Sequence, residues 1–481
     1  MILSFSDEGF KKVLISFFLL VFASISLYRL GAFPTVLYDE PMYANTAYFF
    51  ATHSKFFNSL TGYSGQEFFL YPGIVSVFLK GIPSTLYGFR KINLIFGLVS
   101  VFLFSNLCIK LLKSRAVIFG TVACFVFSNI VFIAHRIVRP ESFALMFCMF
   151  TLFYGTSYLA LLRDKDVFLL GLTMSLLSLV HPICVVFYIS FIIPWFWILI
   201  KNKIFLKSLA PFVLGHLPTL ILSLIYFKFW SIYSPQEWID AVIGSGRIPG
   251  RSIFLGFFDN LVWVYKGYVM GTKRAFLVAI EFFVVAWGLT QFKRNHFVFF
   301  LSVVTLLYFV FSQLLFQPYL RPYYTLLIPS IVLLIGLFVD RARVKRPTFI
   351  LVVFLYAGYS LLGNVYLFWM NRSNDDYDSL KKEVVKSLPS YENIFINSHY
   401  FWFWFKSDAR YGHEFRGSTQ SLENHDLYIL NFESNPNSNV SGGSSRIPKL
   451  ISWAGEYDVR KQRSLVKVTV SESYGRFEVW Q

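Results

Sequence analysis

Apolar runs of about 20 residues recur along this chain from residue 11 to residue 369, and they constrain its fold more than any other feature. A helix of that length crosses the ~30 Å hydrocarbon core of a bilayer, where only helices and closed barrels satisfy the backbone polar groups. Of the 481 residues, 56% are apolar and 15% are charged. Soluble domains are nearer ~25% charged, so the chain is predicted to be a polytopic, all-α membrane protein.

Eleven of the runs have the length and the flanking residues of membrane spans. A further run, 68–83, is short and contains Pro72 and Gly73, so we read it as a juxtamembrane helix. The predicted spans lie near 11–33, 91–109, 116–134, 140–162, 166–182, 183–200, 208–229, 276–292, 297–316, 322–340 and 347–369.

The positions of Lys and Arg predict which loops face the cytoplasm. If 68–83 lies on the outer surface, the inner links hold 14 positive residues and the opposite short links hold three. If that run crossed the bilayer, the bias would invert at every loop, against the positive-inside rule. The sequence thus predicts an inner-membrane protein with a cytoplasmic N-terminus, an uncleaved first span and two long external loops, 34–90 and 230–275.

The composition changes at residue 371. Residues 371–481 carry 14 acidic and 14 basic residues, so the net charge of +17 belongs entirely to residues 1–370. Basic cytoplasmic loops explain this excess, so the predicted partners include membrane lipids and exclude nucleic acid. The tail has a helical start and strand-like runs at 392–398, 426–432 and 465–471. These predict a small extracytoplasmic α/β domain that follows a transmembrane domain.

Two adjacent carboxylates, Asp39 and Glu40, follow the first span at the outer mouth of the bilayer. Such a position suits general base catalysis on a substrate that arrives along the membrane surface. The alternative is that they cap the helix that starts near Pro41. Glu67, in the same external loop, is a further candidate.

Two arginines and a carboxylate form a second cluster, HRIVRPE, at an outer mouth between two spans. Arg136 and Arg139 are three residues apart, so on a helix they could point the same way and bind a phosphate through planar, bidentate hydrogen bonds. The alternative is that they extend to lipid headgroups. Glu141 follows Pro140. Arg321 and His181, the latter in LVHP, are two further candidates. Arg321 is positive, His181 is titratable, and both are predicted to lie at the outer ends of spans.

Three motifs together resemble a known family. They are D-E-x-x-Y-A at Asp39–Ala44, R-x-x-R-P-E at Arg136–Glu141, and R-x-Y-Y at Arg321–Tyr324 with Pro329 beyond it. Over about residues 10–340 they are similar in order and spacing to the GT-C-type membrane glycosyltransferases that use polyprenyl-phosphate sugars. That family includes protein O-mannosyltransferases and lipid A aminoarabinose transferases. The chain departs from it where a lysine often found near the end of the fifth span is replaced by His181.

The resemblance implies a GT-C-like membrane domain, a sugar donor linked to a polyprenyl monophosphate, and an active site at the outer face. Asp39 would act as base in one inverting step. The donor phosphate would be bound by Arg136, Arg139, Arg321 and His181, without a required metal, although a divalent ion stays an open alternative. Glu40 and Glu141 would position the acceptor or the arginines, and further candidate residues are Tyr43 and Tyr324.

Two other functions stay open at this point. A glycan polymerase or ligase would place its signature in a large late external loop, and 230–275 is long enough for one. A secondary transporter would also have charged groups near the membrane, but usually shows an internal repeat. Glu281, inside a predicted span, is a functional hypothesis without an assigned role. The sequence does not identify the sugar, the acceptor or the lipid length.

Overall fold

The computed structural model describes most of the membrane part of the chain and selected parts of the tail. Contacts divide the chain into two units: Met1–Ser26, Leu94–His135 and Pro140–Val365 form the first, and Leu27–Asn93, Arg136–Arg139 and Tyr366–Gln481 form the second. The described residues are 7–34, 36, 40–54, 56, 68–231, 234–237, 257, 260–262, 265, 275–315, 321–341, 346–374, 376–386, 388, 394–396, 403, 409–411, 427–432, 465–471 and 475–480.

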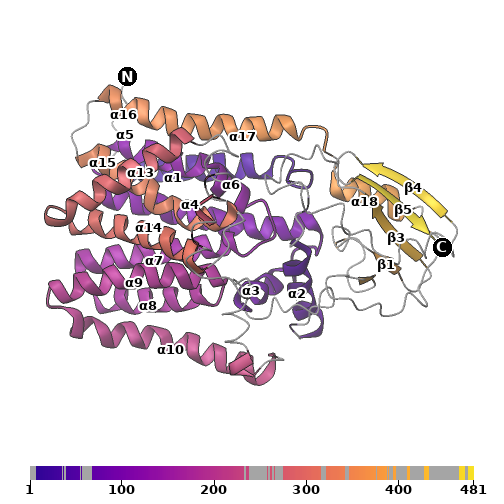
Figure 1. The fold of residues 1–481 in the computed structure, drawn as a ribbon, viewed down its shortest axis with the longest axis horizontal. Helices are drawn as coiled ribbons and strands as arrows, with labels where there is room; N and C mark the ends of the chain where they lie inside the picture. Colours follow the sequence, from indigo (N-terminus) through magenta and orange to yellow (C-terminus); the bar gives the residue numbers. More distant parts are fainter. Residues whose placement is uncertain are drawn as a thin grey trace. The chain divides into compact units, whose positions relative to one another are not determined.

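The helices of the membrane part follow the predicted runs closely. Within the first unit, α8 packs against α7 and α10, α9 packs against α14, and α15 packs against α5, α13 and α14 (Figure 1). Their bounds are α1 Asp7–Leu27, α4 Leu86–Leu111, α5 Arg115–Phe127, α6 Asn129–Ala134, α7 Glu141–Leu161, α8 Asp164–Ser178, α9 Pro182–Lys201, α10 Phe205–Phe229, α13 Ala275–Thr290, η2 Gln291–Lys293, α14 His296–Leu315, η3 Arg321–Leu326, α15 Ile328–Arg341, α16 Arg346–Val353, the π-helix η4 Phe354–Gly358, and α17 Tyr359–Met370.

Burial separates the core of the first unit from its lipid-facing side. In α15 nearly every side chain is buried, from Ile328 to Val339. In α10, by contrast, large apolar side chains such as Leu206, Leu220 and Leu224 stay exposed. An exposed apolar face of this length fits a helix that borders lipid.

Nine helices in the described part of the chain are long and apolar enough to cross a membrane, so the chain is a multi-pass membrane protein. Two of the eleven predicted spans fall on shorter helices. The span predicted at 116–134 is divided at Ser128 into α5 and α6, and the one at 166–182 corresponds to α8, of 15 residues. The total of eleven spans stays a prediction.

The ambiguous run 68–83 forms α3, Leu70–Phe78. Its nine residues extend about 13 Å, less than half of a ~30 Å hydrocarbon core, so α3 is too short to span it. α3 packs against α2, Glu40–His53. The buried residues of α2 include Ala44 and Ala47.

The described parts of the tail contain one helix and one mixed sheet. The strand order is β2-β1-β3-β5-β4: β1 is parallel to β2 and β3, and β5 is antiparallel to β3 and β4. β1, β3 and β4 fall inside the three strand-like runs of the sequence, whereas β2 and β5 were not predicted. The bounds are α18 Tyr377–Val385, β1 Ile394–Ile396, β2 Ala409–Tyr411, β3 Leu427–Phe432, β4 Leu465–Ser471 and β5 Gly475–Trp480.

Candidate active site

The candidate site is organised by the first turns of α4. Thr85 precedes this helix and its Oγ1 accepts a hydrogen bond from the amide of Gly88 at 3.1 Å. A side chain at Gly88 would meet the Pro83 carbonyl at 1.9 Å, so only glycine fits this entry. Arg90 and Asn93 follow, three residues apart and therefore on one face of the helix. Both side chains are completely buried.

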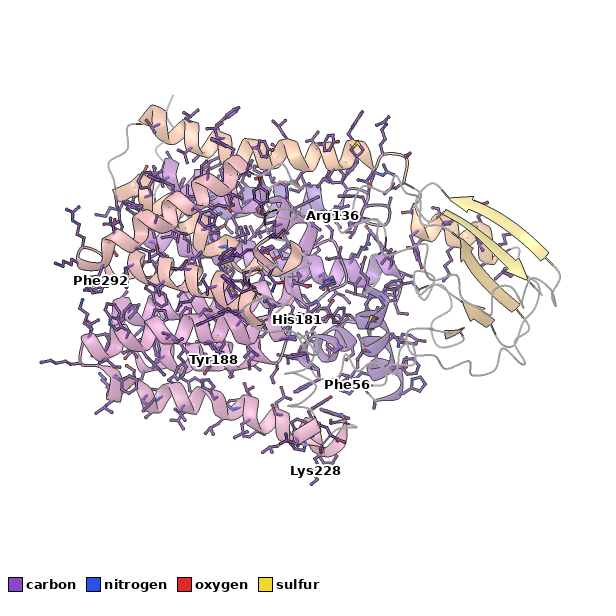
Figure 2. All side chains as sticks on the ribbon, viewed as in Figure 1. Phe56, Arg136, His181, Tyr188, Lys228 and Phe292 are labelled. Atoms are coloured by element: carbon purple, nitrogen blue, oxygen red, sulfur yellow. The ribbon has the colours of Figure 1, made fainter. Side chains whose placement is uncertain are left out.

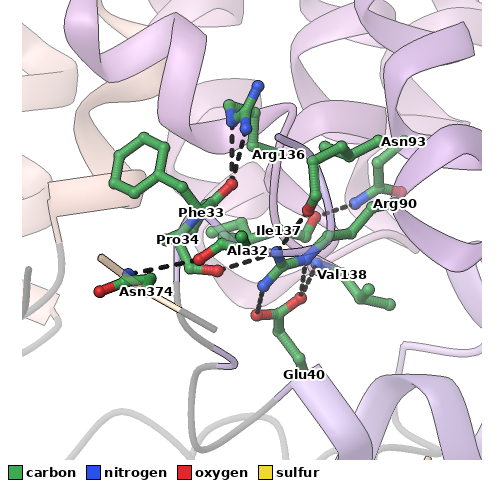
Figure 3. A network of polar contacts seen from close by, with 11 residues as sticks. Ala32, Phe33, Pro34, Glu40, Arg90, Asn93, Arg136, Ile137, Val138 and Asn374 are labelled. Carbon is green, nitrogen blue, oxygen red and sulfur yellow. Dashed lines mark hydrogen bonds and ion pairs between the residues drawn. The ribbon is translucent and has the colours of Figure 1, made fainter. Parts of the chain in front are cut away.

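Arg90 and Glu40 form a buried, two-bonded ion pair. Arg90 Nη2 donates to Glu40 Oε1 at 2.8 Å and Nε donates to Oε2 at 3.1 Å, with both side chains fully excluded from solvent (Figure 3). Arg90 Nη1 also donates to the carbonyls of Leu30 and Pro34, each at 2.8 Å. The pair is stable because further hydrogen bonds satisfy both charged groups. It joins the start of α2 to α4 and to the segment after α1.

The turn that carries Arg139 is held through its backbone. Glu40 Oε2 accepts a hydrogen bond from the Val138 amide at 2.8 Å, and Asn93 Nδ2 donates to the carbonyls of Ile137 and Arg139, the latter at 3.0 Å. Asn93 Oδ1 in turn accepts from Tyr71 Oη in α3 at 2.9 Å. Glu40 and Asn93 thereby orient the backbone from which the buried side chain of Arg139 projects.

Arg136 binds protein carbonyls. Its Nε and Nη2 donate to the Phe33 carbonyl at 3.1 and 2.7 Å, and Nη2 donates to the Tyr28 carbonyl at 2.8 Å (Figures 2 and 3). The guanidinium lies over the rings of Phe33 and Phe368, 5.3 and 5.2 Å from their centres. Burial, followed by the charge of Arg90, lowers the pKa of Arg136 to about 9, so the side chain remains a cation at neutral pH.

Arg136 and Arg139 do not lie on a helix. Residues 135–140 form turns and bends between α6 and α7, so the three-residue interval does not align Arg136 with Arg139. Tyr43, in α2, is half-buried and its ring meets Tyr71 edge to face at 6.0 Å. Asp39 and Glu67 lie outside the described residues.

The remaining candidates belong to the first unit. Glu141 is the first residue of α7 and is buried, and α7 packs against η3, which contains the buried Tyr324. His181 caps α9 (Figure 2): its Nδ1 accepts from the Ile183 amide at 3.3 Å, with Pro182 in the first turn. Arg321 begins η3, and its side chain lies outside the described residues.

Two residues of the site, Arg90 and Asn93, were missed by the sequence analysis. Arg90 carried a signal, because an arginine at the predicted outer end of a span stands on the side that the positive-inside rule disfavours. Arg136 and Arg139 stand on that same predicted side. For Asn93, the only signal in the sequence was its position three residues after Arg90. Among the described residues, no three His, Cys, Asp or Glu side chains lie together so that they could hold a metal ion.

No known protein family and no curated protein matches the chain by sequence. Solved structures match it by fold. ArnT from Cupriavidus metallidurans bound to undecaprenyl phosphate aligns with a TM-score of 0.65 and 11% identity over 97% of both chains. Its apo state aligns with a TM-score of 0.62 and 12% identity, again over 97% of both. The chain shares the fold of ArnT.

The polytopic helical fold that the resemblance to lipid A aminoarabinose transferases implied is confirmed by this likeness. Arabinosyltransferase EmbB from Mycobacterium smegmatis aligns with a TM-score of 0.48 and 12% identity, over 76% of this chain and 38% of that one. At 11–12% identity, the likeness to ArnT describes the path of the chain, and the chemistry has to be argued from the residues.

Proposed function

We propose that this protein is a glycosyltransferase that transfers a sugar from a polyprenyl-phosphate donor to an acceptor at the outer face of the cytoplasmic membrane. The observation that carries the proposal is that the chain has the fold of ArnT, a protein that was solved bound to undecaprenyl phosphate. In this chain, a buried network holds the turn that bears Arg139. The three sequence motifs add the residues that such a reaction needs. The acceptor is a protein, a lipid or an envelope glycan.

In the proposed reaction, Asp39 takes a proton from an acceptor hydroxyl or amine. The acceptor oxygen or nitrogen attacks the anomeric carbon, the bond from that carbon to the phosphate oxygen breaks, and the configuration inverts. Polyprenyl phosphate leaves with the bonding electrons. Arg139, together with Arg321, stabilises the negative charge that grows on the phosphate. His181 and Glu141 remain candidates for contacts to the donor, and Tyr43 and Tyr324 for its placement.

The contacts support different roles for the paired residues of each motif. Glu40 is bound by Arg90 and by the Val138 amide, so we assign it the positioning of the Arg139 turn. Arg136 is directed to the Tyr28 and Phe33 carbonyls, so we assign it a structural role. We assign the chemistry to the other member of each motif, Asp39 as the base and Arg139 as a contact to the donor phosphate, as the family resemblance implies.

The products distinguish this function from its alternatives. Purified protein is supplied with a membrane extract and lipid-linked sugars, and the released lipid is identified by mass spectrometry. The proposed transferase releases polyprenyl monophosphate in a one-to-one ratio with transferred sugar. Release of the pyrophosphate would indicate a glycan polymerase or ligase. Movement of the lipid-linked sugar across a vesicle membrane without cleavage would indicate a transporter.

The role of Arg139 is tested by a lysine substitution. Arg139→Lys keeps the charge but loses the planar, two-bonded geometry, so transfer is expected to fall ~10-fold or more, with normal membrane insertion. The rate is measured with saturating acceptor and the donor affinity by titration. Arg115→Lys, on a side chain exposed at the start of α5, is the matched control and should keep the wild-type rate. A wild-type rate in Arg139→Lys would contradict the phosphate contact and point to Arg321.

The sidedness of the chain is tested with reporters. The proposed arrangement has eleven spans, a cytoplasmic N-terminus and an extracytoplasmic α/β domain over 371–481. A reporter that is active only outside the cytoplasm should be active when fused after residue 375 or inserted in 55–65, and inactive when inserted at 202–203 between α9 and α10. A cytoplasmic tail would contradict an active site at the outer face.

A further inference from the structure

The segment after α1 is held by side chains along its whole length. α1 ends at Leu27, and Arg29 then adopts a left-handed conformation, with φ 51°, that turns the chain sharply. Arg136 binds the carbonyls of Tyr28 and Phe33, and Arg90 binds those of Leu30 and Pro34. Asp39 follows Pro34 by five positions in the sequence. Within Tyr28–Pro34, the backbone is therefore bound by two buried arginines.

The first residues of the tail bind this same segment. Arg29 Nη1 donates to the carbonyls of Asn371 and Arg372 at 3.2 and 2.6 Å, and Nη2 donates to that of Asn374 at 2.7 Å. In return, Asn374 Nδ2 donates to the Ala32 carbonyl at 3.3 Å (Figure 3), and the Tyr377 amide donates to the Gly31 carbonyl at 3.4 Å. These residues are more than 340 positions apart in the sequence.

Gly31 shows how closely the first residues of the tail approach Tyr28–Pro34. A Cβ at this position would lie 2.5 Å from Asp376 Oδ2, and its nearest neighbours would all be atoms of the Asp376 side chain. Asp376 is itself fixed, because its Oδ1 accepts from the Ser379 amide at 3.0 Å as the N-cap of α18. The contact thus leaves no room for even a methyl group unless Asp376 moves.

We propose that the described residues of 371–377 act as a positioning clamp that fixes Tyr28–Pro34, the segment that precedes the proposed base Asp39 in the sequence. The clamp rests on the proposed function, because it concerns the placement of Asp39. Arg90 and Arg136 hold one set of carbonyls in Tyr28–Pro34 and the clamp holds another, so the segment is constrained by three separate parts of the chain. The tail is then a component of the catalytic apparatus, in addition to any part it has in acceptor binding.

The clamp is tested on the full-length protein with Arg29→Gln, which removes the forked guanidinium. Three quantities are measured: kcat, the KM for the donor, and hydrogen–deuterium exchange of the peptide that covers Tyr28–Pro34. Because a small misplacement of a catalytic group slows the chemistry more than binding, kcat should fall about 10-fold or more while the donor KM stays within about twofold. Exchange in the peptide should accelerate about 10-fold.

A double-variant cycle keeps the test independent of general destabilisation. Gly31→Ala introduces the clash with Asp376 and should lower kcat about fivefold, whereas Gly31→Ala combined with Asp376→Ala removes the clashing atoms. The double variant should return to within about twofold of Asp376→Ala alone. Arg163→Gln is the matched control, because Arg163 is half-exposed and pairs with Asp166 at the start of α8, away from the clamp, so kcat and exchange should stay unchanged.

The outcomes separate the clamp from the proposed function. Loss of kcat with constant donor KM and recovery in the double variant support the clamp. Faster exchange with wild-type kcat in Arg29→Gln would overturn it, and so would unchanged exchange. A wild-type protein that transfers no sugar would instead overturn the proposed function, and the clamp's positioning role with it.

Discussion

Sugar transfer is expected to stop when Asp39 is replaced by asparagine. The substitution keeps the size and most of the helix-capping capacity of the side chain but removes its basicity. Glu40 is engaged by Arg90 and by the Val138 amide, and we propose its neighbour Asp39, which the family resemblance implies, as the base. Loss of general base catalysis lowers rates by about 10²–10⁴-fold, so the residual rate should approach the detection limit.

The comparison with Glu40→Gln makes this result specific. Glu40→Gln breaks a buried ion pair, so it should reduce the amount of folded protein. Asp39→Asn should leave that amount, and the binding of undecaprenyl phosphate, near wild type. Both variants are purified in parallel and compared for yield, monodispersity, lipid binding and turnover. Normal turnover in Asp39→Asn would mean that Asp39 serves only as a cap and that Glu141 has to be tested as base.

Removal of Arg90 is expected to have the largest effect on stability. Arg90→Met leaves the Glu40 carboxylate buried without its ion-pair partner and the Leu30 and Pro34 carbonyls without their shared donor. Breaking a buried pair in this way costs about 3–5 kcal/mol, which is a large part of the stability of an ordinary domain. The free energy of unfolding is measured by denaturant titration in detergent.

A second ion pair provides the control for burial. Arg163 Nε and Asp166 Oδ2 are also 2.8 Å apart, but the Arg163 side chain is 48% exposed. Arg163→Met should therefore change the free energy of unfolding by less than about 1 kcal/mol. Equal losses in Arg90→Met and Arg163→Met would contradict the importance that we assign to burial. Combining Glu40→Gln with Arg90→Met should cost less than the sum of the single losses, because each single variant leaves the other group unpaired.

The membrane fold could be predicted because its signals are local. The length and apolarity of one run of residues decide whether that run can cross a bilayer, and this reasoning correctly separated 68–83 from the spans. The strand-like runs of the tail also had a local signal, and β1, β3 and β4 lie within them. β2 was missed because its three residues, Ala409–Tyr411, include Arg410 and stand between Asp408 and Gly412, so no apolar run marks them.

The site could be predicted only as a set of candidates. Adjacent residues such as Asp39 and Glu40 are equivalent in a sequence argument, since both are carboxylates at the same membrane mouth. The positioning role that we assign to Glu40 comes from Arg90, which reaches it from 50 positions further along the chain. Arg136 and Arg139 were likewise treated as one pair. In the structure, Arg136 binds the carbonyls of Tyr28 and Phe33, which lie more than 100 positions away in the sequence.

The sequence by itself determined that this chain is a multi-pass membrane protein, because hydrophobic length is a property of contiguous residues. The three motifs selected the GT-C-like fold. Only the tertiary structure decided which of the charged groups bind one another. A buried charge must find partners that satisfy it, and here those partners come from α4, the 136–139 turn and residues 371–377, whose proximity to Tyr28–Pro34 no local pattern encodes.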